Sequence, residues 1–363
     1  MKEKNKTIFF LLGSFKVGGV EKVASLVGEN LIRSGYDVKI LLLKDTIDLP
    51  VDHLKEHIIN LNTQNYNNRI VKILVSYYSL WKYYFKYRPY RIISFSSGLN
   101  ILLFFTMLPN QVFRIDTNLF WVKSKLYRRR ILKIIGFLPN IKKVITPSQE
   151  LRFRFKPYVP ANSYRKFTTI HNPLSFQPFK NESLPEDINK PYLVSVGRLD
   201  KYKGFEQLIR CFAVADFKTN FFLYIIGSGP MEQDLKIIIK ELGMEHRVKL
   251  LGFKKYPQPL ISNAEGLILN STFESFGNVI VEALSLGVPV ISNDCDFGPR
   301  EIIEHGTNGL LYDQSKDENL IKILEEFVNS DSLRSKLKKN TSHKMDRFDS
   351  EKITAEWIEK ILQ

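Results

Sequence analysis

Residues 192–204 read YLVSVGRLDKYKG, and a regular alternation of strands and helices begins with this stretch. The apolar run at 192–196 is typical of a buried strand, and a helical pattern follows at 204–212. Strands and helices then alternate, with strands at 221–226, 248–251, 266–270 and 290–292 and helices at 231–242 and 279–286. Such alternation predicts a mostly parallel, doubly wound sheet.

The first half of the chain shows the same alternation. A strand at 8–12, a helix at 20–33 and a strand at 38–43 form one β-α-β unit, and further strands are predicted at 92–95, 112–115, 144–146 and 167–170. One helical stretch carries apolar residues at three- and four-residue spacing, which predicts packing in the core. These residues are Val71, Leu74, Tyr77, Tyr78, Trp81 and Tyr84.

A proline-rich polar segment at 171–191 is typical of a linker between the two halves. We therefore predict an α/β protein with two Rossmann-like, doubly wound domains that face a cleft, at 1–175 and 190–345. A helix at 346–363 is expected to close the chain. The length of 363 residues fits two domains of about 150 residues each.

The composition excludes several classes of protein. With 44% hydrophobic and 25% charged residues, the chain is neither disordered nor collagen-like. The longest strongly apolar stretch without a charge, 98–109, is shorter than the roughly 20 residues of a membrane span. The apolar run near the N-terminus lacks a signal-peptide cleavage site, so we interpret it as the first buried strand. Two cysteines, Cys211 and Cys295, fit a reducing cytoplasm.

The net charge of +15 is unevenly distributed. Residues 1–180 contain 30 Lys and Arg against 10 Asp and Glu, a net of +20, whereas residues 181–363 contain 23 against 28, a net of −5. The candidates for an anionic partner are nucleic acid, a membrane surface or a phosphate-bearing substrate. A solvated basic face is the alternative. Because the basic block extends from Arg69 to Lys180, we favour an anionic partner.

Several common ligand sites are missing from the sequence. No GxxxxGK[ST] phosphate loop and no GxGxxG dinucleotide motif opens the first helix. The histidines and cysteines form no metal-ligand pattern, and His53 and His57 lie in a polar context. Asp294-Cys295-Asp296 resembles the D-x-D of metal-dependent sugar transferases but follows a strand of the second domain. We therefore predict no metal site.

Two loops of the second half carry the candidate chemistry. Arg198 and Lys203 follow a buried strand, and a guanidinium and an ammonium at this spacing suit a diphosphate. The alternative is that both are solvated loop cations. Phe273 to Ala283 also follows a strand, and the start of its helix offers backbone N–H groups to a phosphate. Glu274 and Glu282 can bind the hydroxyls of a ribose and a sugar, the alternative being a helix cap and a surface residue.

GRLDKYKG at 197–204 and the E-x7-E spacing from Glu274 to Glu282 resemble the nucleotide-sugar site of family-four retaining glycosyltransferases of the GT-B fold. Further motifs occur in the order of that family. They are GGVE at 18–21, HNP at 171–173, GSGP at 227–230, LGF at 251–253, GPREII at 298–303 and GTNG at 306–309.

The resemblance implies roles for these positions. Arg198 and Lys203 would hold the donor diphosphate and stabilise the charge of the leaving group. Glu274 would contact the donor sugar and hold it for attack on the same face, and Glu282 would bind the ribose.

Further binding roles follow from the same resemblance. Backbone amides of Phe276, Gly277 and Asn278 would contact sugar and phosphate, and Phe253 with Lys254 would flank the base. Gly18 and Gly19 would let the first-domain loop approach the phosphate.

The sequence departs from the family at one position. Many relatives place a histidine after a strand in the middle of the first domain, and residues 113–118 read FRIDTN instead. Asp116 is expected to occupy that place as a fourth catalytic candidate beside Glu274, Arg198 and Lys203.

These features predict a metal-independent transferase that needs no cofactor beyond a nucleotide-sugar donor. It would move a hexose or N-acetylhexosamine from a UDP-sugar, with retention, to a lipid-linked or growing glycan in bacterial surface-polysaccharide synthesis, such as that of lipopolysaccharide. We expect it in the cytoplasm, at the inner face of the cell membrane. A UDP-sugar epimerase of similar architecture and a nucleic-acid-binding protein remain alternatives, although no nucleic-acid module is recognised.

Residues 123–138 have the profile of a helix that lies on an anionic membrane surface. Apolar residues would share one helical face and cations much of the remainder. The alternative is that the apolar face packs on the sheet of the first domain. The apolar set is Tyr127, Ile131, Ile134, Ile135 and Leu138, and the cations are Lys125, Arg128, Arg129 and Lys133.

Overall fold

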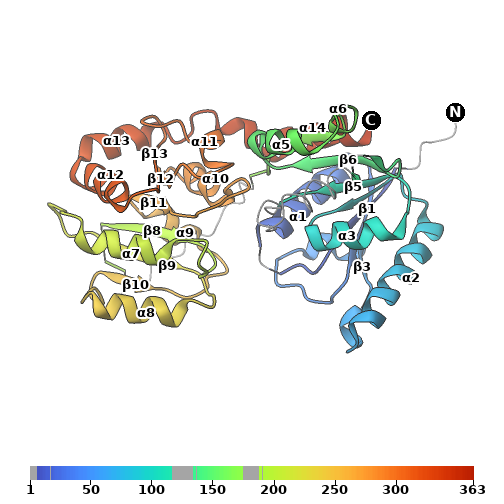
Figure 1. The fold of residues 1–363 in the computed structure, drawn as a ribbon, viewed down its shortest axis with the longest axis horizontal. Coiled ribbons are helices and arrows are strands. Elements are labelled where there is room, and N and C mark those ends of the chain that lie inside the picture. The colour runs from blue at the N-terminus through green and yellow to red at the C-terminus, as the bar shows by residue number, and fades with distance from the viewer. Residues whose placement is uncertain (1–5, 17, 117–133, 136, 175–187, 190) are drawn as a thin grey trace. The chain divides into compact units, whose positions relative to one another are not determined.

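The computed structural model describes residues 6–16, 18–116, 134–135, 137–174, 188–189 and 191–363 (Figure 1). The chain divides into two compact units. The first contains Met1–Ser175 and Phe348–Gln363, and the second contains Phe176–Arg347. Each unit is built on one parallel sheet with helices between its strands.

The sheet of the first unit has the strand order β3-β2-β1-β4-β5-β6-β7, and every pair of neighbours is parallel. The predicted N-terminal strand is confirmed as β1, and every one of its residues is buried. A central parallel strand is covered on both faces, which explains its uninterrupted apolar run. The strands are β1 (Thr7–Leu12), β2 (Asp37–Leu42), β3 (Ile58–Asn60), β4 (Arg91–Ser94), β5 (Gln111–Arg114), β6 (Ile141–Thr146) and β7 (Phe167–Thr169).

Helices connect these strands. They are α1 (Gly19–Arg33), α2 (Arg69–Tyr87), α3 (Ser97–Thr106), α5 (Gln149–Phe155) and α6 (Ala161–Tyr164). Short 3₁₀ turns lie at Asp52–His57, Thr63–Asn65, Lys156–Tyr158 and Met345–Phe348.

The prediction that the apolar stripe of α2 packs in the core is wrong. Only Ser76 and Leu80 of this helix are buried. Leu74 and Tyr78 are 61% and 69% exposed, and Trp81 is also exposed. Spacing identifies an apolar face, but it does not say what covers that face.

The C-terminal helix α14 (Ser350–Trp357) belongs to the first unit and continues as one π-helical turn, Ile358–Leu362. The Trp357 ring stacks on Phe95 with 5.9 Å between ring centroids. Arg91 Nε donates a hydrogen bond of 2.9 Å to the carbonyl oxygen of Ile361. Residues 350–362 therefore complete the core of the first unit.

The sheet of the second unit has the order β10-β9-β8-β11-β12-β13 and is also parallel throughout. Its strands are β8 (Tyr192–Val196), β9 (Phe222–Ile226), β10 (Val248–Leu250), β11 (Gly266–Leu269), β12 (Val290–Asn293) and β13 (Gly309–Tyr312). Its helices are α7 (Phe205–Val214), α8 (Glu232–Glu241), α9 (Gln258–Ser262), α10 (Asn278–Ser285), α11 (Pro299–Ile302), α12 (Asp317–Asn329) and α13 (Asp331–Lys339).

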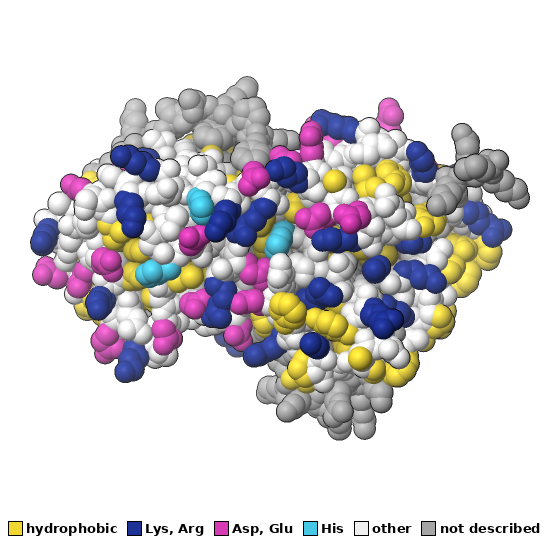
Figure 2. All heavy atoms as spheres, turned by 90° about the horizontal axis from the view of Figure 1, so that it is seen from above, with side chains coloured by type: hydrophobic (Ala, Val, Ile, Leu, Met, Phe, Trp, Pro, Cys, Tyr) yellow, Lys and Arg dark blue, Asp and Glu magenta, His cyan; other side chains and the backbone are white. Residues whose placement is uncertain are grey.

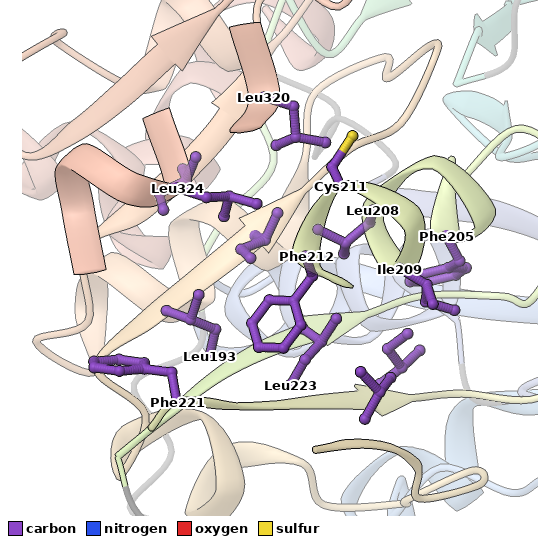
Figure 3. Close-up of a cluster of buried hydrophobic side chains, with 14 of the residues drawn as sticks. Leu193, Phe205, Leu208, Ile209, Cys211, Phe212, Phe221, Leu223, Leu320 and Leu324 are labelled. Carbon is purple, nitrogen blue, oxygen red and sulfur yellow. The ribbon is translucent and has the colours of Figure 1, made fainter. Parts of the chain in front are cut away.

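The core of the second unit lies between this sheet and the helices α7 and α12 (Figure 3). Phe212 of α7, Leu223 of β9 and Leu324 of α12 are fully buried there. Burial of such side chains stabilises the unit by about 1.5–3 kcal/mol each.

Several elements were not predicted from the sequence, among them the strands β3 and β13 and the helices α9, α11, α12 and α13. The two strands have three and four residues, too few for a period-two pattern to stand out. The described helices include none that is long and apolar enough to cross a membrane. The predicted surface helix at 123–138 lies largely outside the described residues.

Candidate functional site

The strand order of the second unit brings two distant loops together. β8 pairs directly with β11, although β9 and β10 come between them in the sequence. In open α/β sheets, ligands bind at the carboxyl ends of the strands where the strand order reverses in this way. The loop at 197–204 follows β8, and the loop at 270–277 follows β11. The candidate residues Arg198, Lys203 and Glu274 therefore share one edge of one sheet.

Lys203 and Glu274 form an ion pair at this edge. The Lys203 Nζ atom donates to Oε1 of Glu274, and the two side chains are only 26% and 15% exposed. The Ser271 hydroxyl donates to the same oxygen at 2.9 Å. Charges that are partly removed from water interact more strongly than surface charges, so the pair fixes the carboxylate in position.

The turn that carries Lys203 is held by Asn270 at the end of β11. Asn270 Nδ2 donates to the Gly204 carbonyl oxygen at 2.8 Å, and Asn270 Oδ1 accepts a hydrogen bond from the Tyr312 hydroxyl. Gly204 has φ +63°, and a Cβ atom there would lie 2.2 Å from the Asn270 carbonyl oxygen. Only glycine therefore fits this turn.

Asn270, Ser271 and Tyr312 were not predicted as site residues. Each is a polar side chain at the carboxyl end of a strand and is buried. That combination is the signal that sequence reasoning could have used, because buried polar groups are retained where they make hydrogen bonds.

The predicted phosphate-binding turn begins α10. Gly277 precedes the helix with φ +94°, and no side chain caps this end. Phe276 is buried, Asn278 is the first helical residue, and Glu282 lies one turn further along, partly buried. The positive end of the helix dipole is thus near Glu274 in the chain and available to an anion.

The remaining donor-site candidates are exposed. The Arg198 side chain is 73% exposed, with its Nε atom 3.8 Å from Asp200 Oδ2. Phe253 is 55% exposed, and Lys254 beside it is exposed as well. Both an aromatic face and a guanidinium are therefore accessible to a ligand.

Asp116 lies in the first unit, in a buried cluster of polar side chains. Its Oδ1 atom is 2.8 Å from Nη2 of Arg114, which also donates to Asn172 of the HNP motif. The other oxygen, Oδ2, is buried without a hydrogen-bond partner among the described residues. Burial raises the pKa of Asp116, and the charge of Arg114 opposes this shift.

Glu21 of the GGVE motif belongs to the same cluster. Burial raises the pKa of Glu21, and the nearby Asp116 carboxylate raises it further. Gly18 and Gly19 form the start of α1, where Gly18 lies against the Glu21 side chain. Glu21 and Asn172 belong to motifs that the sequence analysis identified. Arg114 was not predicted as a site residue, because no local pattern distinguishes it.

The residues that could suggest a metal have other partners. His53 Nε2 lies 3.3 Å from Glu29 Oε2, whereas His57 Nδ1 lies 3.0 Å from the Val38 carbonyl oxygen. Asp294 pairs with Arg300 at 2.8 Å. Within the described ranges, no three His, Cys, Asp or Glu side chains form a group that could hold a metal ion.

Both thiols are expected to be unreactive in the native protein. Burial raises the pKa of Cys211 to about 12 and that of Cys295 to about 12, and the charge of Glu274 adds to the shift at Cys295. Because the thiolate is the reactive form, almost none is present near neutral pH. Ellman's reagent should modify neither cysteine until the protein is unfolded, when both should react. Rapid modification of Cys295 in the folded protein would contradict this description of the site.

The chain is similar to known glycosyltransferases in sequence and in fold. Residues 176–344 match the family described as "Glycosyl transferases group 1". The N-acetylgalactosamine-N,N'-diacetylbacillosaminyl-diphospho-undecaprenol 4-alpha-N-acetylgalactosaminyltransferase of Campylobacter jejuni is 27% identical over 99% of this chain and 100% of its own. The lipopolysaccharide 1,6-galactosyltransferase of Salmonella typhimurium is 32% identical over 47% of this chain and 48% of its own. The structure of Anabaena HepE in complex with UDP and glucose superimposes with a TM-score of 0.78 at 22% identity, over 98% of this chain and 99% of that one. This likeness confirms the predicted GT-B fold with its two Rossmann-like domains.

Proposed function

We propose that this chain, whose residues 176–344 match the group 1 glycosyltransferases and which has the GT-B fold, transfers a hexose or N-acetylhexosamine from a UDP-sugar with retention at the anomeric carbon. The acceptor would be a lipid-linked or growing glycan. The observation that carries the proposal is the Lys203–Glu274 pair at the switch point of the second sheet. It places a cation that suits a diphosphate beside a carboxylate that can bind sugar hydroxyls.

In this proposal Lys203 and Arg198 act on the donor diphosphate. Negative charge develops on the departing nucleotide when the bond to the sugar breaks. Cations and amide dipoles that are already in place stabilise this charge without reorganising. Lys203 acts as a point charge, and Arg198 can bind two phosphate oxygens at once.

Glu274 would hold the sugar rather than the phosphate. Its carboxylate is oriented by Lys203 and Ser271, so it can accept hydrogen bonds from sugar hydroxyls in one fixed orientation. Fixing the sugar and the leaving group together favours attack from the face that the nucleotide leaves. In the first unit, the buried Asp116 would contribute to the acceptor side of the reaction.

Two relatives support the choice of donor and acceptor. Anabaena HepE was crystallised in complex with UDP and glucose, and the name of the Campylobacter jejuni relative includes a diphospho-undecaprenol-linked sugar. The predominance of Lys and Arg in residues 1–180 favours an acceptor that carries phosphate or lies at an anionic membrane.

Excess EDTA is expected to leave the transfer rate largely unchanged. Arg198, Lys203 and the first turn of α10 supply the positive field that a divalent cation provides elsewhere. The rate of UDP release with and without EDTA measures the effect. Loss of transfer that Mn²⁺ or Mg²⁺ restores would instead favour a role for Asp294 and Asp296 as metal ligands.

Glu282→Ala should mainly weaken binding of the nucleotide. A carboxylate that binds ribose hydroxyls contributes about 1–3 kcal/mol through charged hydrogen bonds. Titration calorimetry with UDP measures this loss, and kcat should change little. Glu241→Ala, an exposed glutamate at the end of α8, is the matched control. Unchanged UDP affinity in Glu282→Ala would remove Glu282 from the site.

A panel of UDP- and GDP-sugars tests the proposed function as a whole. The expected result is release of UDP from one donor, with the anomeric configuration retained in the product as determined by NMR. Conversion of the donor sugar to its epimer without an acceptor would favour the epimerase. DNA binding that depends on salt, together with no affinity for UDP, would favour the nucleic-acid-binding protein.

A further inference from the structure

The solvent-facing side of α2 is apolar and aromatic. Six of its exposed residues occur at steps of one, three and four, so they share one side of a helix about 28 Å long. They are Ile70, Ile73, Leu74, Tyr78, Trp81 and Phe85. A helix on the surface of a globular unit ordinarily turns polar side chains to water.

The neighbouring helix α3 extends this face. α2 and α3 pack against each other, and Ile101 and Phe105 of α3 are 57% and 63% exposed. Met107, directly after α3, is 55% exposed. We call these nine residues on and beside α2 and α3 the α2–α3 surface. It holds nine of the 19 large exposed hydrophobic residues in the described part of the chain, so exposure is concentrated here.

The charged residues of α2, α3 and the segments that adjoin them have one sign. Residues 57–115 contain no Asp or Glu and seven Lys or Arg. Lys82, Lys86 and Arg88 are exposed at the end of α2, and Arg69 is exposed at its start. Figure 2 shows hydrophobic side chains interspersed with Lys and Arg at the lower right of the view, on the unit that contains α2 and α3. An occupant of this surface must be apolar in part and anionic in part.

An anionic lipid bilayer has both properties within a few ångströms of depth. Aliphatic side chains enter the boundary of the acyl chains, while Trp and Tyr prefer the level of the head groups. Long lysine side chains reach from a buried stem to the phosphates. An isolated apolar residue on a surface needs no explanation, but a contiguous patch of this kind marks an interaction site.

We propose that the α2–α3 surface docks the protein on an anionic membrane, with its apolar side chains at the acyl boundary and its cations at the lipid phosphates. The inference rests on the proposed function in one respect: a lipid-linked acceptor requires the enzyme to work at a membrane. The docking itself needs neither donor nor acceptor, so the two proposals can be tested separately.

Vesicle co-sedimentation tests the apolar part. The wild type should bind vesicles of phosphatidylcholine mixed with phosphatidylglycerol and bind those of phosphatidylcholine alone weakly. Leu74→Gln with Tyr78→Gln should weaken binding about tenfold or more, because both exposed side chains lose their insertion into lipid. Val214→Gln with Ile237→Gln removes two equally exposed apolar residues from the second unit and should change nothing.

A second pair of variants tests the charges. Lys82→Glu with Lys86→Glu should weaken binding to the anionic vesicles, and the remaining binding should depend less on salt. Lys336→Glu with Lys338→Glu makes the same change on α13 and is the control. Equal binding of the wild type to neutral and anionic vesicles would contradict the proposal.

Trp81 reports the depth of insertion directly. The chain has three tryptophans, and Trp121→Phe leaves only Trp81 and Trp357. Because Trp357 is buried against Phe95, brominated lipids should quench the fluorescence of Trp81 alone. Absence of quenching in bound protein overturns the assignment of this face. A dimer in sedimentation velocity that Leu74→Gln with Tyr78→Gln converts to monomer also overturns it, since the occupant is then a second copy of the chain.

The failures of the two proposals have different signatures. Circular dichroism and thermal unfolding like those of the wild type show that each variant is folded. If the variants transfer sugar and bind vesicles as the wild type does, the docking surface is wrong and the proposed function stands. If vesicle binding responds as expected but no donor is used, the proposed function is wrong and the docking surface stands.

Discussion

Glu274→Gln should lower the rate of sugar transfer about 10³-fold, as expected when a preorganised electrostatic group is removed from an active site. The glutamine side chain has nearly the same shape but cannot carry the charge that pairs with Lys203. The sugar would lose its fixed acceptor of hydrogen bonds, and Lys203 would lose the partner that orients it. The measurement is kcat for UDP release with the donor that the panel identifies.

Two controls separate chemistry from folding. Glu206→Gln removes a carboxylate from the exposed pair with Arg210 on α7, and it should leave kcat unchanged. Thermal unfolding of Glu274→Gln should stay close to that of the wild type, because Ser271 can still donate to the amide oxygen. Full activity in a folded Glu274→Gln protein would contradict the assignment of Glu274 to the active site.

Lys203→Ala should lower kcat about 10²- to 10³-fold, the effect of removing one preorganised group that stabilises developing charge. The loss should appear more in kcat than in KM, because the charge on the diphosphate grows as the bond to the sugar breaks. Lys201→Ala is the matched control, since Lys201 is exposed in the same loop two residues earlier. Loss of activity in both variants alike would indicate a general effect of loop charge rather than a role for Lys203.

A variant that carries both substitutions, Lys203→Ala and Glu274→Gln, tests the two predictions together. Lys203 and Glu274 contact each other, so their effects should not add. If each mainly orients the other, Lys203→Ala with Glu274→Gln should lose little more than the worse single variant. Additive losses would show that the two side chains act on donor and sugar independently.

Local sequence was sufficient for most of the elements that carry the site. β8 was predicted at its observed bounds, and the predicted strand at 266–270 and helix at 279–286 lie within one residue of β11 and α10. Apolar runs bounded by glycine-containing turns specify such elements without distant contacts. The motif spacing then placed Lys203 and Glu274 in the loops that follow two of the strands.

The same local reasoning was wrong about α2. Its three- and four-residue spacing identified the apolar face, but the buried residues of this helix are Ser76 and Leu80, on another side. Which side of a helix meets the sheet depends on the packing of the whole unit. An apolar helix face has the same periodicity whether it packs in the core or stays on the surface of the unit.

The sequence by itself determined two Rossmann-like halves and the chemical types of residue at the ends of their strands. Only the tertiary structure decided which of those residues meet. Lys203 and Glu274 are 71 positions apart and pair because β8 lies beside β11, and Arg114 reaches Asn172 across 58 positions. Strand order and side-chain packing are properties of long-range contacts, and such contacts leave no periodicity in the residues that make them.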